Sequence, residues 1–148
     1  MQVTGALLLV SLGTFTAGAV LLLTLSRRPL LVGFAGPAVT LAGSASGIAA
    51  AILSLCKGPL IIDLPWSVPA GSAAVGMDPL SALFAVPILL ISSLSAVYSH
   101  GYLSGHGEKS HGATLYWTWF NLLVGGMLLV TAARNALLFL LGWELMAI

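Results

Sequence analysis

The sequence predicts an all-α membrane protein with about five transmembrane helices. Of its 148 residues, 59% are hydrophobic and only 6% are charged, and its mean hydropathy is +1.08. Soluble domains carry about 25% charged residues, so these values exclude a soluble fold. A net charge of +1 at pH 7 gives no reason to expect nucleic-acid binding, which needs clustered lysines and arginines.

Cys56 is the only cysteine, which excludes an internal disulfide and a cysteine-based metal or iron–sulfur site. The first apolar run has no basic segment before it. It is also longer than the roughly 7–15 apolar residues of a signal peptide. We therefore predict that this run stays in the protein as a membrane helix.

Four apolar segments are long enough to cross a membrane, and a fifth is shorter. At 1.5 Å per residue, ~22 residues reach ~33 Å, which exceeds a hydrocarbon core of ~30 Å. The last segment would reach only ~21 Å, so we expect a truncated fifth helix. The predicted helices cover residues 4–25, 31–55, 79–98, 113–133 and 135–148.

The segment 57–78 differs in composition from the helices around it. It is rich in proline and glycine and holds a run of β-forming residues at 60–64. This composition predicts an extracytoplasmic loop with a short hairpin. Asp78 followed by Pro79 is a strong signal for a helix start, with Asp78 as the N-cap.

A second polar segment covers residues 99–112 and is predicted to be a loop in water. It contains His100, His106 and His111, which are separated by glycines and other polar residues. Metal ligands usually have tighter spacing, so we favour solvated side chains over a metal site. No metal and no other cofactor is expected.

The basic residues favour one orientation of the helices. With the N-terminus outside, Arg27, Arg28 and Lys109 would lie on the cytoplasmic side, and Lys57 and Arg134 would lie outside. Basic residues are in excess in cytoplasmic loops, so three against two favours this arrangement, although the excess is small.

One carboxyl group, Glu144, lies inside the last apolar segment. A charge in the bilayer costs at least ~2.5 kcal/mol, so such groups are candidates for function. Measured from Arg134, Glu144 lies ~15 Å deep and Asn121 ~20 Å deep, and Ser92 lies ~20 Å from the start of its own helix. We therefore hypothesise that Glu144, Asn121 and either Ser92 or Ser93 form a polar cluster for proton translocation. The alternative is a protonated carboxyl group without a function.

Three segments resemble a known family of membrane subunits. They are 76–84 (GMDPLSALF), 98–103 (YSHGYL) and 133–146 (ARNALLFLLGWELM). These segments resemble the antiporter-like membrane subunits of respiratory complex I and their relatives. The likeness is greatest to the large membrane subunit of formate hydrogenlyase and to hydrogenase-4 component B.

The resemblance implies a fold of about fourteen helices that contains two inverted repeats, of which this chain would hold the N-terminal part. It also implies a glutamate in a Trp-Glu motif on the fifth helix, paired with a lysine on a later helix. Trp143 and Glu144 match that motif. The expected partners are membrane lipids, other membrane subunits of one complex, and a second chain that completes the subunit. The expected location is the inner (plasma) membrane.

The function that the resemblance implies is coupling of electron transfer to ion movement in a hydrogenase-4, formate hydrogenlyase or NADH-quinone oxidoreductase-like complex. This chain would hold no redox centre or catalytic site of its own. Two alternatives stay open at this point. One is a membrane scaffold fragment that transports nothing, and the other is a subunit of an Mrp-type Na⁺/H⁺ antiporter.

Overall fold

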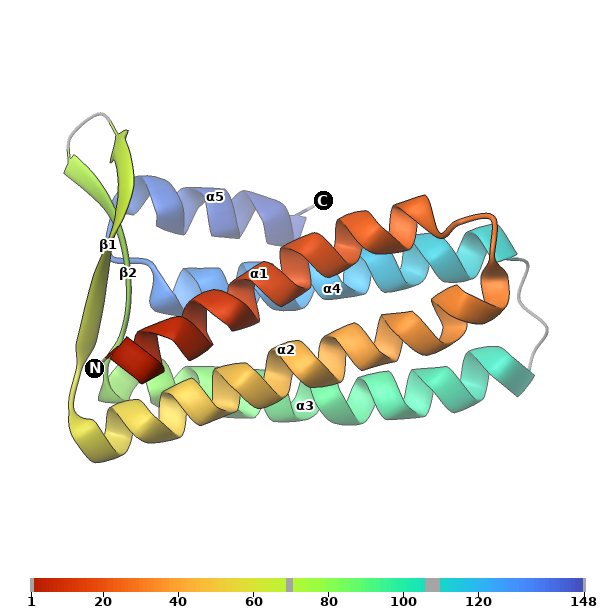
Figure 1. Ribbon diagram of the computed structural model, residues 1–148, viewed down its shortest axis with the longest axis horizontal. Coiled ribbons are helices and arrows are strands. Elements are labelled where there is room, and N and C mark those ends of the chain that lie inside the picture. Colours follow the sequence, from red (N-terminus) through yellow and green to blue (C-terminus); the bar gives the residue numbers. More distant parts are fainter. Residues whose placement is uncertain (1, 69–70, 106–109, 148) are drawn as a thin grey trace.

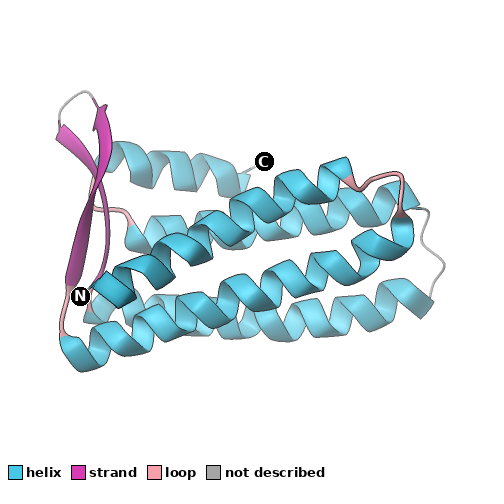
Figure 2. Ribbon diagram, in the orientation of Figure 1, coloured by secondary structure: helices cyan, strands magenta, loops and turns pink. Residues whose placement is uncertain are grey.

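The structure, a computed structural model, describes residues 2–68, 71–105 and 110–147. It is a bundle of helices with a two-stranded β-hairpin at one end (Figures 1 and 2). In chain order the elements are α1 (Gln2–Thr24), α2 (Pro29–Lys57), β1 (Leu60–Val68), β2 (Gly71–Met77), α3 (Pro79–Gly105), α4 (Ser110–Ala132) and α5 (Ala136–Ala147).

The predicted fold class, an all-α membrane protein, is confirmed. Within the described residues, four helices are long and apolar enough to cross a membrane, and α5 is a shorter apolar helix. The helices are apolar on both sides: Leu8 and Phe15 of α1 are buried, while Val20 of the same helix is 63% exposed. A helix that is apolar all round suits a lipid surface, so the chain is a multi-pass membrane protein.

Helix α4 is the centre of the bundle, because it packs against each of the other four helices. Helices α1, α2 and α3 surround it, and α2 packs against both of its neighbours in the chain. Successive helices run in opposite directions, so α1, α3 and α5 start at the same end, beside the hairpin (Figure 1). Groups at the starts of these helices are therefore brought together.

The hairpin fills the connection between α2 and α3. Its strands are antiparallel, with Leu60 opposite Met77, and β2 also forms an isolated bridge between Val75 and Ala133. Residues 73–77 of β2 are buried. The strands are longer than the predicted β-forming run at 60–64, since they cover Leu60–Val68 and Gly71–Met77.

Helix α3 continues to Gly105, so part of the segment analysed as a polar loop is helical. His100 lies within this helix, and its Nδ1 atom is 2.9 Å from the Gly33 carbonyl oxygen of α2. That carbonyl lacks its usual helical donor because Pro37, four residues on, has no N–H. His106 and Lys109 lie outside the described residues, as does the His111 side chain.

Candidate functional site

Helix α5 carries Glu144 and is anchored at its first turn. The connection from α4 is only three residues long, 133–135. The Asn135 side-chain oxygen accepts a hydrogen bond of 2.8 Å from the Leu137 N–H, so Asn135 is the N-cap of α5. From there α5 extends along α4 and ends partway along the bundle (Figure 1). Glu144, three residues before the end of α5, therefore lies partway along the length of the bundle and not at the end where the helix starts (Figure 1).

Two glycines bring α5 and α4 into backbone contact. A Cβ atom on Gly142 would lie 3.2 Å from the Val130 nitrogen and 3.3 Å from the Gly126 carbonyl oxygen. A Cβ atom on Gly126 would lie 3.2 Å from the Gly142 carbonyl oxygen. The helices are thus as close as small residues allow, as in other membrane-helix interfaces. This contact fixes which side of α5 faces α4.

Glu144 faces away from α4. It follows the buried Gly142 by two residues, which is ~200° around the helix, and its side chain is exposed. Among the described residues, no hydrogen bond or ion pair reaches its carboxyl group. The surrounding side chains Phe139, Leu140, Leu141 and Trp143 are exposed apolar residues. We call these four residues and Glu144 the outer face of α5.

Asn121 lies on the opposite side of α4 from α5. It is fully buried, and its side-chain oxygen accepts a hydrogen bond of 3.0 Å from the Thr40 hydroxyl of α2. Its amide group donates to the Trp117 carbonyl at 2.9 Å and to the Gly36 carbonyl at 3.4 Å. Asn121 therefore joins α4 to α2 and is turned away from Glu144.

The two serines are on α3, which packs against α2 and α4. Ser92 is 5% exposed, and the Ser93 hydroxyl donates to the Leu89 carbonyl of its own helix at 2.7 Å. The structure thus brings none of the predicted neighbours to Glu144 within the described chain. A proton-carrying role for Glu144 stays a prediction, and the described residues supply no polar partner for its carboxyl group.

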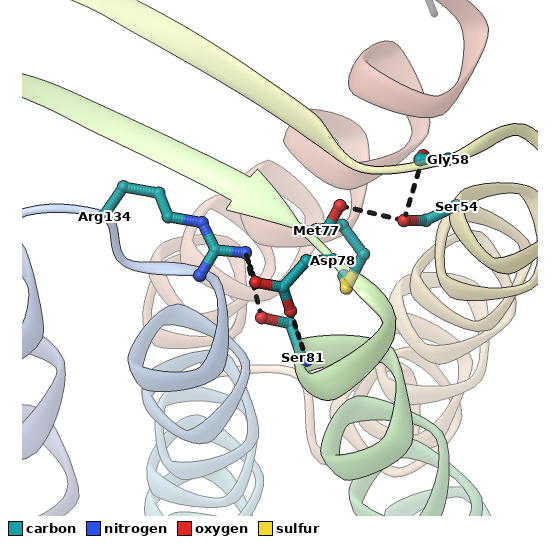
Figure 3. A network of polar contacts seen from close by, with 6 residues as sticks. All are labelled: Ser54, Gly58, Met77, Asp78, Ser81 and Arg134. Atoms are coloured by element: carbon teal, nitrogen blue, oxygen red, sulfur yellow. Dashed lines mark hydrogen bonds and ion pairs between the residues drawn. The ribbon is translucent and has the colours of Figure 1, made fainter.

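A cluster of polar side chains that was not predicted from the sequence lies beside the start of α5 (Figure 3). An Arg134 guanidinium nitrogen, Nη2, is 3.0 Å from an Asp78 carboxylate oxygen and donates to the Ser81 hydroxyl at 3.1 Å. The other Asp78 oxygen accepts a hydrogen bond of 2.7 Å from the Ser81 N–H, which confirms Asp78 as the N-cap of α3. We call Asp78, Ser81 and Arg134 the polar clamp.

Asp78 is held in its charged form by this arrangement. The hydrogen bond from the Ser81 N–H is the largest influence and lowers the pKa of the Asp78 carboxyl group below its ordinary value. Burial opposes this effect, and the Ser81 hydroxyl and the Arg134 charge lower the pKa further by smaller amounts. Arg134 is 24% exposed and Asp78 is 38% exposed, so water weakens their attraction only in part.

The polar clamp is continuous with the hairpin. The Arg134 N–H donates to the Ala74 carbonyl of β2 at 2.9 Å. Its side chain crosses Gly76, where an added Cβ atom would lie 2.8 Å from the Arg134 Nε atom. Next to this, the Ser54 hydroxyl of α2 donates to the Met77 carbonyl at 2.8 Å (Figure 3). One signal in the sequence could have suggested the clamp: Asp78 and Arg134 have opposite charges and precede helices that start on the same side.

Comparison with known proteins adds a family likeness to this geometry. Residues 70–111 match a family model described as the N-terminus of chain 5 of NADH-ubiquinone oxidoreductase (complex I). This region resembles the start of a complex I membrane subunit. The match includes Asp78 and Ser81 of the polar clamp and all of α3.

Two curated relatives come from Mycobacterium tuberculosis. They are the uncharacterized proteins MT0090 of strain CDC 1551 / Oshkosh and Rv0083 of strain ATCC 25618 / H37Rv, and each is 29% identical to this chain over 114 residues. The alignment covers 77% of this chain but 17% of each relative. The chain is therefore similar to a part of much longer proteins.

Proposed function

We propose that this chain is the N-terminal part of an antiporter-like subunit that moves protons across the inner membrane, with Glu144 as the group that binds and releases them. The single observation that carries the proposal is the likeness of residues 70–111 to the N-terminus of complex I chain 5. The Trp143–Glu144 motif on the fifth helix supports it, because this is where the resembling subunits hold their glutamate.

The position of Glu144 agrees with such a role. A carboxyl group on an apolar helix, at membrane depth, is costly unless it meets a polar partner or water. Its side chain lies on the outer face of α5, which the described helices leave open. A further membrane helix that carries a lysine would both cover this face and stabilise the charged form of the carboxyl group.

The complex that we propose for this subunit is of the hydrogenase-4 or formate hydrogenlyase type, or an NADH-quinone oxidoreductase-like relative, in which electron transfer drives ion movement. Its partners would be the other membrane subunits of that complex. The motifs at 76–84, 98–103 and 133–146 support this type of complex. The Mrp-type Na⁺/H⁺ antiporters share the motifs, so measuring both proton and sodium movement distinguishes the two.

The test is Glu144→Gln in the assembled complex, with ion movement into membrane vesicles measured against turnover. Glutamine keeps the size of the side chain and cannot bind a proton, so coupled ion movement should be lost while the complex still assembles. Asp63→Asn is the matched control, because it removes a carboxyl group from the hairpin instead of from α5. Unchanged coupling in Glu144→Gln would support a membrane scaffold instead.

A further inference from the structure

Arg134 links two elements, β2 and the start of α3, to the start of α5. Its backbone N–H bonds to Ala74 of β2, and its guanidinium group bonds to Asp78 and Ser81 at the start of α3. It lies two residues before the first residue of α5, Ala136. A displacement of Arg134 is therefore transmitted to α5 across a single residue.

Helix α5 has little other support. It packs on one side against α4, with a smaller contact to β2, and its outer face is exposed. The glycine contact with α4 holds the middle of the helix close, but packing on one side leaves its tilt weakly determined. The anchor at its start is then the second point that defines the direction of the helix.

This direction decides where Glu144 lies. The glycine contact holds α5 at Gly142, two residues before Glu144, whereas Arg134 lies ~15 Å from Glu144 along the axis. Without the anchor at Arg134 the helix can pivot and rotate about the glycine contact, which turns the outward-facing Glu144 side chain. A hydrogen bond tolerates only a few tenths of an ångström around ~2.9 Å. A small loss of order at the clamp is thus enough to separate Glu144 from a polar partner.

We propose that Arg134 is a positioning residue, which uses its ion pair with Asp78 to set the direction of α5 and thereby the place of Glu144. The expected effect on ion movement rests on the proposed function. The expected effect on the direction of α5 does not. The clamp lies at the end of the bundle where α3 and α5 begin, so it acts on the carboxyl group from a distance of ~15 Å along the helix.

The structural part is tested by amide hydrogen exchange on the protein in its membrane complex. Asp78→Asn is the main variant, because asparagine still caps a helix but carries no charge. We expect the amides of α5 to exchange roughly fivefold faster in Asp78→Asn and in Arg134→Gln, relative to those of α1 in the same sample. Arg134→Lys should restore most of the protection. Lys57→Gln, which removes a charge at the same end of the molecule, should change nothing.

Ion movement measured on the same variants tests the positioning role. Asp78→Asn and Arg134→Gln should lower coupled ion movement severalfold at equal amounts of assembled complex, and Arg134→Lys should recover it. Unchanged amide exchange of α5 in Asp78→Asn and Arg134→Gln would show that the clamp does not anchor the helix. Faster exchange with full ion movement would show that the clamp does not position Glu144 for transport. If Glu144→Gln alone leaves ion movement intact, the proposed function fails, while the exchange result still decides whether the clamp exists.

Discussion

At the scale of single residues, Asp78 combines two roles that its sequence position suggested only in part. One carboxylate oxygen caps α3 through the Ser81 N–H, and the other forms the ion pair with Arg134. A cap needs only a local signal, Asp followed by Pro, and was therefore predictable. The ion pair joins residues 56 positions apart in the chain, since 134 − 78 = 56. The two charges meet only because α3 and α5 both pack against α4 and start at the same end of the bundle (Figure 1).

The charged form of Asp78 gives a prediction for the dependence of stability on pH. Because the folded state lowers the pKa of this carboxyl group, its contribution to stability is complete above the ordinary value of 3.8 and is lost as the pH falls through the lower folded value. Asp78→Asn should therefore reduce the free energy of unfolding at neutral pH. The free energy of unfolding of this variant should also decrease less than that of the wild type as the pH is lowered.

The measurement is unfolding in detergent micelles between neutral and acidic pH, with Lys57→Gln as the control. That variant removes a charge near the hairpin and leaves the clamp intact, so it should keep the acid dependence of the wild type. An Asp78→Asn protein with the full acid dependence would show that another carboxyl group is responsible.

At the scale of elements, helix rise predicts the position of a residue along its helix but carries no information on rotation about the helix axis. Helix rise predicted similar depths for Glu144 and Asn121. In the structure Asn121 faces α2, whereas Glu144 points away from α4 on the outer face of α5. The contact that decides this, Gly126 against Gly142, is a pair of small residues of a kind that is common in membrane helices. Likewise, the polarity of the segment after Tyr98 suggested a loop, whereas α3 continues to Gly105 and its His100 contacts the Gly33 carbonyl of α2.

The contact between α4 and α5 is testable with Gly142→Val. The added side chain would meet the Val130 nitrogen and the Gly126 carbonyl of α4, which are backbone atoms and cannot rotate away. We expect the two helices to separate and stability to fall by ~1–3 kcal/mol. Unfolding in detergent measures this loss.

The matched control is Gly13→Val in α1, because no atom lies within 4 Å of a Cβ added there. It makes the same chemical change in a helix but introduces no clash, so it should cost clearly less. Equal losses in the two variants would mean that helix propensity, and not the contact of α5 with α4, explains the effect.

At the scale of the whole molecule, the described chain forms a bundle around α4, and several of its buried polar side chains hydrogen-bond across helix interfaces. Asn121, Thr40 and Ser11 all hydrogen-bond across helix interfaces. Glu144 is different, because it is exposed on an apolar face. Composition alone was enough to predict the membrane fold. The partner of Glu144 could not be predicted, because the described helices do not supply it.

The most direct test of this account is infrared difference spectroscopy of the assembled complex during turnover, which detects carboxyl groups that gain or lose a proton. The account predicts a carboxyl signal that appears with turnover in the wild type and in Asp63→Asn, and that is absent in Glu144→Gln. The same signal in Glu144→Gln would contradict it.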